Sequence, residues 1–174
     1  MSDDHLGPKA AQVLLKGMDP GSRESGLRLD RHGVWHHEDV PVTHERLARA
    51  LYRWLDRHPD NQRFVLRPSA DFWAWVDVED APFQATLTGL GPDGGLCLVL
   101  SDGSEEVFDG PSIAVGTDDA WYVPVRGGSF EARLGRGAMT HLADYAVEDA
   151  SADQGIVLHL PGGRRIAFTK RRPG

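Results

Sequence analysis

The chain has 174 residues, a single cysteine and a formal net charge of −7 at pH 7. At this length about two thirds of the unfolded surface can be buried, which suits one domain or two tightly packed halves. The lone Cys97 excludes an internal disulfide, and the acidic balance excludes a general nucleic-acid binder, because neutralising phosphates needs a surplus of Lys and Arg.

The first 26 residues predict a short helix and a linker. The helix covers about residues 8–16 and packs Val13 and Leu14, and the linker "GMDPGSRESG" is rich in turn residues. The first charges are acidic and the apolar stretch is short, which fits neither a signal peptide nor a membrane span. We therefore expect a cytoplasmic protein with no membrane partner.

From residue 27 onward the pattern predicts short strands and two helices. The first helix follows "DVPVT", with Thr43 as its N-cap, and stops at "HPDN" at 58–61. The second begins near Gly137. Apolar residues recur at helical spacing on one face of each helix: Leu47, Leu51, Trp54 and Leu55 in the first, and Met139, Leu142, Ala143 and Ala146 in the second.

The other segments alternate apolar and polar residues with period two, which predicts strands and hairpins. They are "GLRLDRHGVW", "RFVLRP", "FWAWVDV", "FQATL", "GLCLVLSDGSEEVF", "SIAV", "AWYVPV" and "GIVLHLPGGRRIAF". The sequence therefore predicts an α+β fold in which antiparallel strands predominate.

Three matched segments in the same order favour a duplicated strand-helix-hairpin unit, with its two halves packed together. The segment "VEDAPFQATL" at 78–87 aligns without gaps with "VRGGSFEARL" at 125–134. The hairpins "GLCLVLSDGSEEVF" and "GIVLHLPGGRRIAF" also align, as do, more loosely, "HGVW" and "DDAW". The predicted organisation is an N-terminal helix and linker at 1–26, a first α+β repeat at 27–110 and a second at 111–174.

The segments "DRHGVWHHEDVPV", "VEDAPF" and "YVPVRGGSFEARLGRGAMTHL" resemble the bacterial family called domain of unknown function twelve eighty-five, over about residues 25–170. Members typically show a Val-Glu-Asp-Ala-Pro-Phe block and a Val-Arg-Gly-x-x-Glu-Ala block before a second helix. The resemblance implies a duplicated α+β fold, a role in ligand sensing or signal transduction, and no catalytic residues. The chain departs from the family where a Pro-x-Glu-Lys segment is usual, because Pro68 is followed by "SADFWAW", with Asp71 as a stand-in for the Glu.

Two adjacent carboxylates, Glu79 and Asp80, follow the predicted strand "FWAWVDV". Strand alternation points them to opposite faces, which does not suit an acid and a base acting on one atom. Because Pro82 has no N–H, we expect Asp80 to fix the turn by accepting from the backbone N–H of Phe83. Glu79 aligns with Arg126 in the repeat, so we predict an ion pair between them that fixes the docking of the two repeats.

A candidate ligand site lies at the entry to the second helix. Arginines there flank glycines, so guanidinium groups and backbone N–H groups could together hold an anion at a helix N-terminus. Aromatic residues could wall a cleft between the repeats. The alternative is that the arginines are surface ion-pair partners and the aromatics are core. The candidate ligand-binding residues are Arg126, Arg133, Arg136, Trp35, Trp121 and Tyr122.

Other polar groups give weaker patterns. The histidines and acids of "HGVWHHEDVPVTH" match no known zinc spacing, so a polar turn cluster is favoured and no metal or other cofactor is expected. No "GxSxG" motif is present and Cys97 lies in mid-strand, so nucleophilic catalysis has no anchor. The basic C-terminus, with Arg164, Arg165, Lys170, Arg171 and Arg172, is expected to be a solvated, partly frayed tail.

Two classes of function follow. The first is a non-enzymatic sensor or binding protein that takes a small anionic ligand or a peptide in a cleft between the repeats, as a monomer or homodimer without nucleic acid. The second is a hydrolase or metal-dependent enzyme that uses Glu79, Asp80 and the histidines. Carboxylates and histidines converging in one pocket would favour the enzyme.

Overall fold

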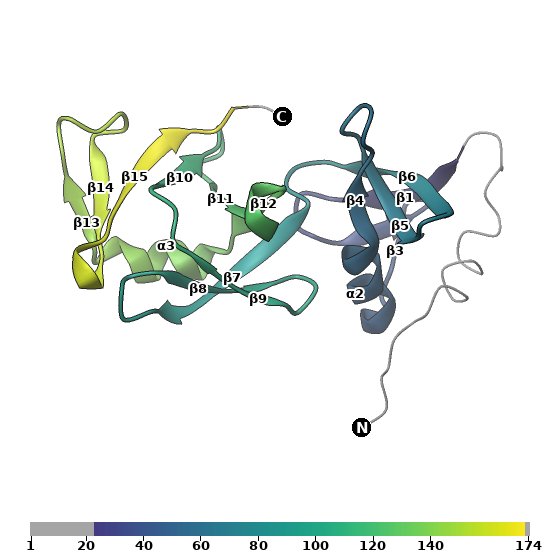
Figure 1. Ribbon diagram of the computed structural model, residues 1–174, viewed down its shortest axis with the longest axis horizontal. Helices are drawn as coiled ribbons and strands as arrows, with labels where there is room; N and C mark the ends of the chain where they lie inside the picture. Colours follow the sequence, from purple (N-terminus) through teal and green to yellow (C-terminus); the bar gives the residue numbers. More distant parts are fainter. Residues whose placement is uncertain (1–22, 173–174) are drawn as a thin grey trace, which may run out of the picture. The chain divides into compact units, whose positions relative to one another are not determined.

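The computed structural model describes residues 23–172 and divides the chain into two compact units after Pro82 (Figure 1). Within residues 23–172 each unit holds one sheet and one α-helix, so the protein is α+β, as predicted. The predicted helix at 8–16 lies outside the described residues. The predicted repeat boundary at residue 110 falls inside the second unit, so the compact units do not follow the proposed repeats.

The first unit is a mixed sheet of six strands in the order β3-β2-β1-β6-β5-β4. Strands β1 and β6 are parallel neighbours, and the other neighbours are antiparallel. Strand β6 has the predicted bounds. The strands are β1 (Glu24–Leu29), β2 (Trp35–His37), β3 (Val40–Pro41), β4 (Leu55–Arg57), β5 (Phe64–Ser69) and β6 (Phe72–Val78).

Helix α2 (Glu45–Trp54) differs from its prediction at both ends. His44, and not Thr43, is the N-cap, and its Nδ1 accepts from the Leu47 N–H at 3.3 Å. The helix ends before "HPDN" because Leu55 begins β4, which pairs with β5. Strand pairing in this hairpin overrides the local helical pattern, a common reason for wrong helix boundaries.

The second unit is a mixed sheet of nine strands in the order β13-β14-β15-β10-β11-β12-β7-β8-β9. The pairs β10 with β15 and β12 with β7 are parallel. Helix α3 (Arg136–Ala143) starts where predicted and buries Ala138 and Leu142. The strands are β7 (Phe83–Leu90), β8 (Leu96–Leu100), β9 (Glu105–Phe108), β10 (Ser112–Val115), β11 (Trp121–Val125), β12 (Phe130–Leu134), β13 (Ala146–Glu148), β14 (Ile156–His159) and β15 (Arg165–Lys170).

The two segments that align best in the predicted repeat are adjacent parallel strands of this sheet. Phe83 of β7 pairs with Ala132 of β12, two residues beyond Phe130, its counterpart in the alignment. The segments therefore share strand type and direction, but a symmetric pairing of equivalent residues does not occur.

Two turns of the nine-stranded sheet lie in contact, one between β7 and β8 and the other between β14 and β15. Gly94 has φ +78°, and a Cβ there would lie 2.4 Å from the Pro161 carbonyl oxygen. Arg164 Nε donates to the Asp93 carbonyl at 3.0 Å. The β7–β8 turn therefore packs against the β14–β15 turn, and only glycine fits at position 94.

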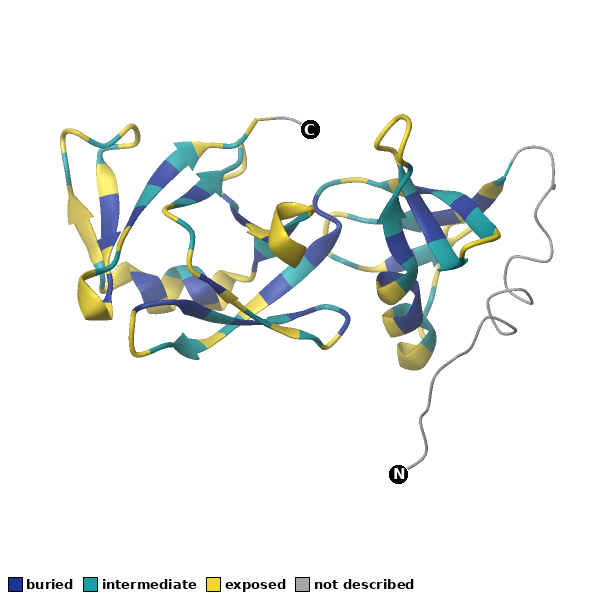
Figure 2. Cartoon of the chain, in the orientation of Figure 1, coloured by how far each residue is buried: buried dark blue, intermediate teal, exposed yellow. Residues whose placement is uncertain are grey.

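Burial alternates along the strands, and dark and pale residues follow one another in Figure 2. In the second unit Ile113 pairs with Phe168 and Val123 with Ala132, and all four are buried. Paired residues share a face, so this side of the sheet is the core. None of the helices within residues 23–172 combines the length and the apolar character needed to cross a bilayer.

Candidate functional site

Polar side chains form a row on the opposite side of the nine-stranded sheet, its outer face. Thr169 of β15 pairs with Ala114, Ala114 with Tyr122 of β11, and Tyr122 with Arg133 of β12. The Arg171 N–H continues the ladder by donating to the Val115 carbonyl at 2.8 Å. Since alternate residues share a face, Arg171 joins Thr169 on this side. The topology thus gathers residues from three separate strands.

Tyr122 lies at the centre of a cluster of charged residues, the Tyr122 cluster. The guanidinium carbon of Arg171 is 3.6 Å from the Tyr122 ring centroid, and Arg133 Nη1 donates to the Tyr122 hydroxyl at 3.3 Å. Arg133 Nη2 also contacts Asp118 at 2.8 Å, and Arg171 Nη2 contacts Glu131 at 2.6 Å. Tyr122 is 1% exposed. The ring and the carboxylates together hold both cations in place.

The loop before β11 is built around this ring. A Cβ at Gly116 would lie 2.9 Å from Tyr122 Cε2 and 3.0 Å from Asp118 Oδ1. Burial raises the pKa of the Asp118 carboxyl, but the hydrogen bond and charge of Arg133 outweigh it, and the pKa lies below its ordinary value. Asp118 is therefore ionised at neutral pH and fixes Arg133.

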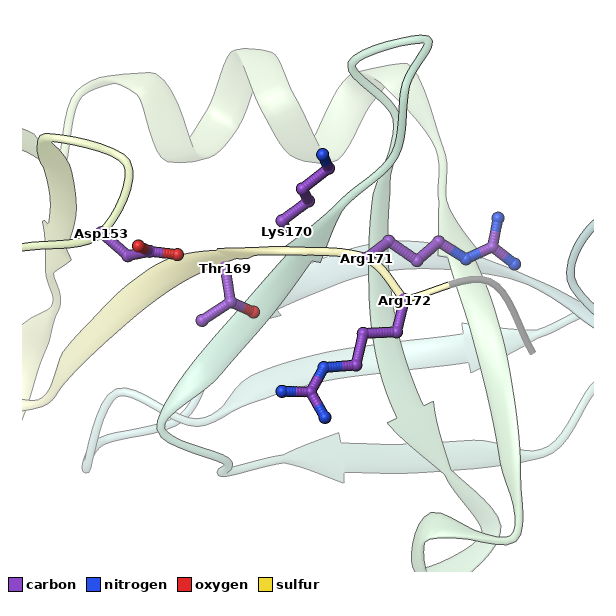
Figure 3. A pocket seen from close by; sticks show the side chains of 5 residues that line it. All are labelled: Asp153, Thr169, Lys170, Arg171 and Arg172. Carbon is purple, nitrogen blue, oxygen red and sulfur yellow. The ribbon is translucent and has the colours of Figure 1, made fainter.

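A depression of about 630 Å³, the basic pocket, adjoins the cluster at the end of β15 (Figure 3). It shares Arg171 with the Tyr122 cluster. Within the described residues, no carboxylate lies within ion-pair distance of Lys170 or Arg172. The pocket therefore presents two cations without a described counter-ion. Its lining residues are Asp153, Thr169, Lys170, Arg171 and Arg172.

A hydrogen-bonded loop supplies the acidic residue of the pocket. Asp149 accepts from the Ser151 N–H at 2.9 Å and hydroxyl at 2.6 Å, and from Arg165 Nη2 at 2.7 Å. These hydrogen bonds, with that of the Ser151 hydroxyl foremost, lower the pKa of Asp149 far below its ordinary value. The Asp149 N–H donates to Gly155 at 2.9 Å, closing the loop. Asp153 is thus carried on a turn that is tied to β15.

The predicted trio of arginines does not form one group. Arg126 follows β11 and contacts Asp102 and Glu106, whereas Arg133 lies beside Tyr122 near the start of β11. Arg126 follows Tyr122, the partner of Arg133, by four residues, which is about 13 Å along a strand. Arg136 is exposed at the first residue of α3. The structure therefore unites Arg133 with Tyr122 and leaves Arg126 with other partners.

The two predicted tryptophans pack against other aromatic rings. Trp121 lies against Phe168, with ring centroids 4.7 Å apart. Trp35 is 1% exposed and meets Tyr52 edge-on at 5.3 Å in the first unit. These contacts agree with the core interpretation of the tryptophans. A cleft that joins Trp35 to Trp121 would involve both units, and it stays a prediction.

Glu79, the first residue of the acid pair, has contacts within the first unit. Glu79 forms an ion pair with Arg28 of β1 and accepts from the Arg31 N–H at 3.3 Å. Arg126, its predicted partner, belongs to the other unit and has its own carboxylates. The Glu79–Arg126 pair therefore stays a prediction, as does the turn-fixing role of Asp80, which lies in the bend after β6.

The histidine-rich segment forms a turn around Asp30. The Asp30 carboxylate accepts from the N–H groups of His32 and Val34, each at 2.9 Å, and contacts His36 Nε2 at 3.0 Å. Burial alone would raise the Asp30 pKa, but these contacts lower it. In the part of the chain that the structure describes, no three His, Cys, Asp or Glu side chains are grouped for a metal ion.

The prediction of a solvated, partly frayed basic C-terminus is wrong about fraying within the described residues, although Arg165, Lys170 and Arg172 are exposed. Residues Arg165–Lys170 form β15, which lies between β14 and β10, and Ile166 is fully buried there. Sequence reasoning therefore missed the basic pocket. The alternation that predicted a strand up to Phe168 continues for two more residues, and extending it would have placed Lys170 on the sheet.

No protein-family model and no curated protein matches the chain. Among solved structures it is similar to a DUF1285 family protein from Silicibacter pomeroyi DSS-3, with a TM-score of 0.63 and 24% identity over 83% of this chain and 79% of that one. It is also similar to a DUF1285 family protein from Shewanella baltica OS155, with a TM-score of 0.55 and 22% identity over 68% of this chain and 90% of that one. The chain therefore has the fold of DUF1285 proteins, which confirms the predicted resemblance at the level of the fold.

Proposed function

We propose that this protein, which shares the fold of two DUF1285 family proteins, is a non-enzymatic binding protein that senses a small anion. The basic pocket carries the proposal, because Lys170 and Arg172 line it without a described counter-ion. Its volume of about 630 Å³ falls within the range of about 300–1,000 Å³ that is usual for small-molecule sites.

Neighbouring groups support an anion at this place. Arg171 is already held by the Tyr122 ring and by Glu131, so its guanidinium group loses little rotamer freedom on binding. Thr169 adds a hydroxyl that can donate to a phosphate or carboxylate oxygen. Charge-assisted hydrogen bonds from Lys and Arg to such oxygens are about twice as strong as neutral ones.

The arrangement also limits the affinity. Figure 3 shows the Lys170 and Arg172 side chains leaving the chain in different directions. An anion that contacts both must draw them together, which costs about 0.5–1.5 kcal/mol for each ordered side chain. We therefore expect weak binding that falls as salt rises.

The enzyme alternative has no specific contact to support it within the described residues. Glu79 engages Arg28, and His36 engages Asp30, so these groups act as partners of fixed neighbours in the first unit. His36 and Asp30 do pair a histidine with a carboxylate, but Glu79 is engaged by Arg28 and not by a histidine. Binding is the function that the geometry supports better.

Thermal unfolding in the presence of inorganic phosphate, sulfate and citrate tests the proposal. An anion that binds the folded state raises Tm with concentration, equivalent to about 2.7 kcal/mol at 100 times Kd. The variant Lys170→Gln/Arg172→Gln should lose this rise. The variant Arg31→Gln/Arg53→Gln removes the same charge from exposed positions of the first unit and should keep it. An equal loss of the Tm rise in both variants, or no rise in the Tm of wild type with any of the three anions, would overturn the proposal.

A further inference from the structure

The basic pocket contains charges of both signs that lack a described counter-ion. Within residues 23–172, the Asp153 carboxylate has no cation at ion-pair distance, although three basic residues line the same pocket. Nearby acids behave differently, because Asp149 engages Arg165 and Glu131 engages Arg171. Asp153 is therefore an acid without a described counter-ion among these cations.

Asp153 lies on the loop described above. The contact of Asp149 with Arg165 ties the loop to the start of β15, and the cations lie at the end of that strand and in the two residues after it. Figure 3 shows Asp153 on this separate loop, with its carboxylate directed towards the strand. The acid and the cations are thus carried on two separate backbone segments.

We infer that the ligand is a small zwitterion, which carries a phosphate or carboxylate group together with a protonated amine. This inference rests on the proposed anion binding and adds the class of the ligand. The anionic group lies against Lys170, Arg171 and Arg172, and the ammonium group donates to Asp153. A ligand with both charges satisfies every charged group that lines the pocket, whereas a simple anion leaves a carboxylate facing it.

Two probes of similar size separate this inference from plain anion binding. O-phosphoethanolamine carries a phosphate and a protonated amine, and ethyl phosphate carries the phosphate alone. At neutral pH ethyl phosphate has the larger net negative charge, so attraction to the cations alone favours it. A preference for O-phosphoethanolamine therefore reports a contact with the amine.

Calorimetric titration of the full chain measures the ratio of the two affinities. Wild type should prefer O-phosphoethanolamine by about two- to five-fold, the size expected for one exposed ion pair. Asp153→Asn should abolish that preference while still binding ethyl phosphate. Asp71→Asn removes the same charge from an exposed turn of the first unit and should leave the preference unchanged.

The outcomes distinguish the two proposals. If wild type binds ethyl phosphate as tightly as O-phosphoethanolamine, or if Asp153→Asn retains the preference, the zwitterion inference is overturned while anion binding stands. If neither probe binds at millimolar concentration, both the inference and the proposed function fail.

Discussion

Asp102 carries a negative charge in a buried position, with its side chain 4% exposed. It accepts from the Ser104 N–H at 3.0 Å and hydroxyl at 2.7 Å, and it contacts the Arg126 guanidinium group. Burial raises the pKa of this carboxyl, but the Ser104 and Arg126 contacts outweigh it and lower the pKa. Arg126 therefore acts as a counter-ion for a buried acid.

Replacing Asp102 tests this role. Asp102→Asn keeps the shape of the side chain and removes the charge, so we expect a loss of about 1–3 kcal/mol in the free energy of unfolding. Urea denaturation measures it. Glu105→Gln, an exposed change in the same hairpin, should shift the free energy by less than about 0.5 kcal/mol. Equal effects of the two changes would contradict the assigned role.

The same carboxylate predicts a pH dependence. The folded-state pKa of Asp102 lies below its ordinary value of 3.8, so the stabilisation by the ionised form is present above that pH. It is lost as the pH falls through the folded-state value. The stability difference between wild type and Asp102→Asn should therefore shrink when urea denaturation is repeated from pH 6 down to pH 3. A constant difference would count against the ion pair.

At the scale of elements, period-two alternation predicted most strands of the second unit, because one face of that sheet is core. Strand β10 has its predicted bounds, and α3 begins within one residue of its prediction. Strand β13 was not predicted because all its residues are exposed and give no alternation. Strand β4 was not predicted because pairing with β5, and not a local sequence pattern, defines it.

The candidate site was predictable only in part, because it depends on strand pairing as β4 does. Arg133 and Tyr122 lie close in sequence and were both singled out. Arg171 reaches Tyr122 only because β15 crosses to lie beside β10 in parallel, a connection that no local pattern shows. Residues from distant strands meet through topology, which the sequence of either segment does not contain.

The contact between the two turns predicts the effect of a single methyl group. Gly94 and Gly163 have nearly equal φ values, +78° and +77°, but a Cβ meets backbone only at Gly94. Gly163→Ala should cost about 1–2 kcal/mol of unfolding free energy through backbone strain alone. Gly94→Ala should cost more, because the turns must also separate. Urea denaturation of both variants measures the difference. Equal losses of unfolding free energy would show that the two turns do not meet at Gly94.

At the scale of the whole molecule, each unit has a sheet and a buried core of its own. Every strand of the nine-stranded sheet lies within residues 83–174, and the division falls directly before β7. A segment with its own core can in principle fold alone. The basic pocket also belongs entirely to this unit.

The second unit is therefore expected to fold without the first. A fragment of residues 83–174 should show a strand-rich circular dichroism spectrum and one cooperative urea transition. It should also keep the phosphate affinity of the full chain. A fragment without a cooperative transition would show that the nine-stranded sheet depends on the first unit.

The location of anion binding tests the account most directly. Two-dimensional ¹⁵N–¹H NMR of the full chain, titrated with inorganic phosphate at low ionic strength, reports the shift of each backbone amide. The account predicts saturating shifts centred on residues 169–172 and Asp153, and their loss in Lys170→Gln/Arg172→Gln. Shifts centred instead on Arg136 at the start of α3, or spread evenly over the chain, would contradict the basic pocket as the binding site.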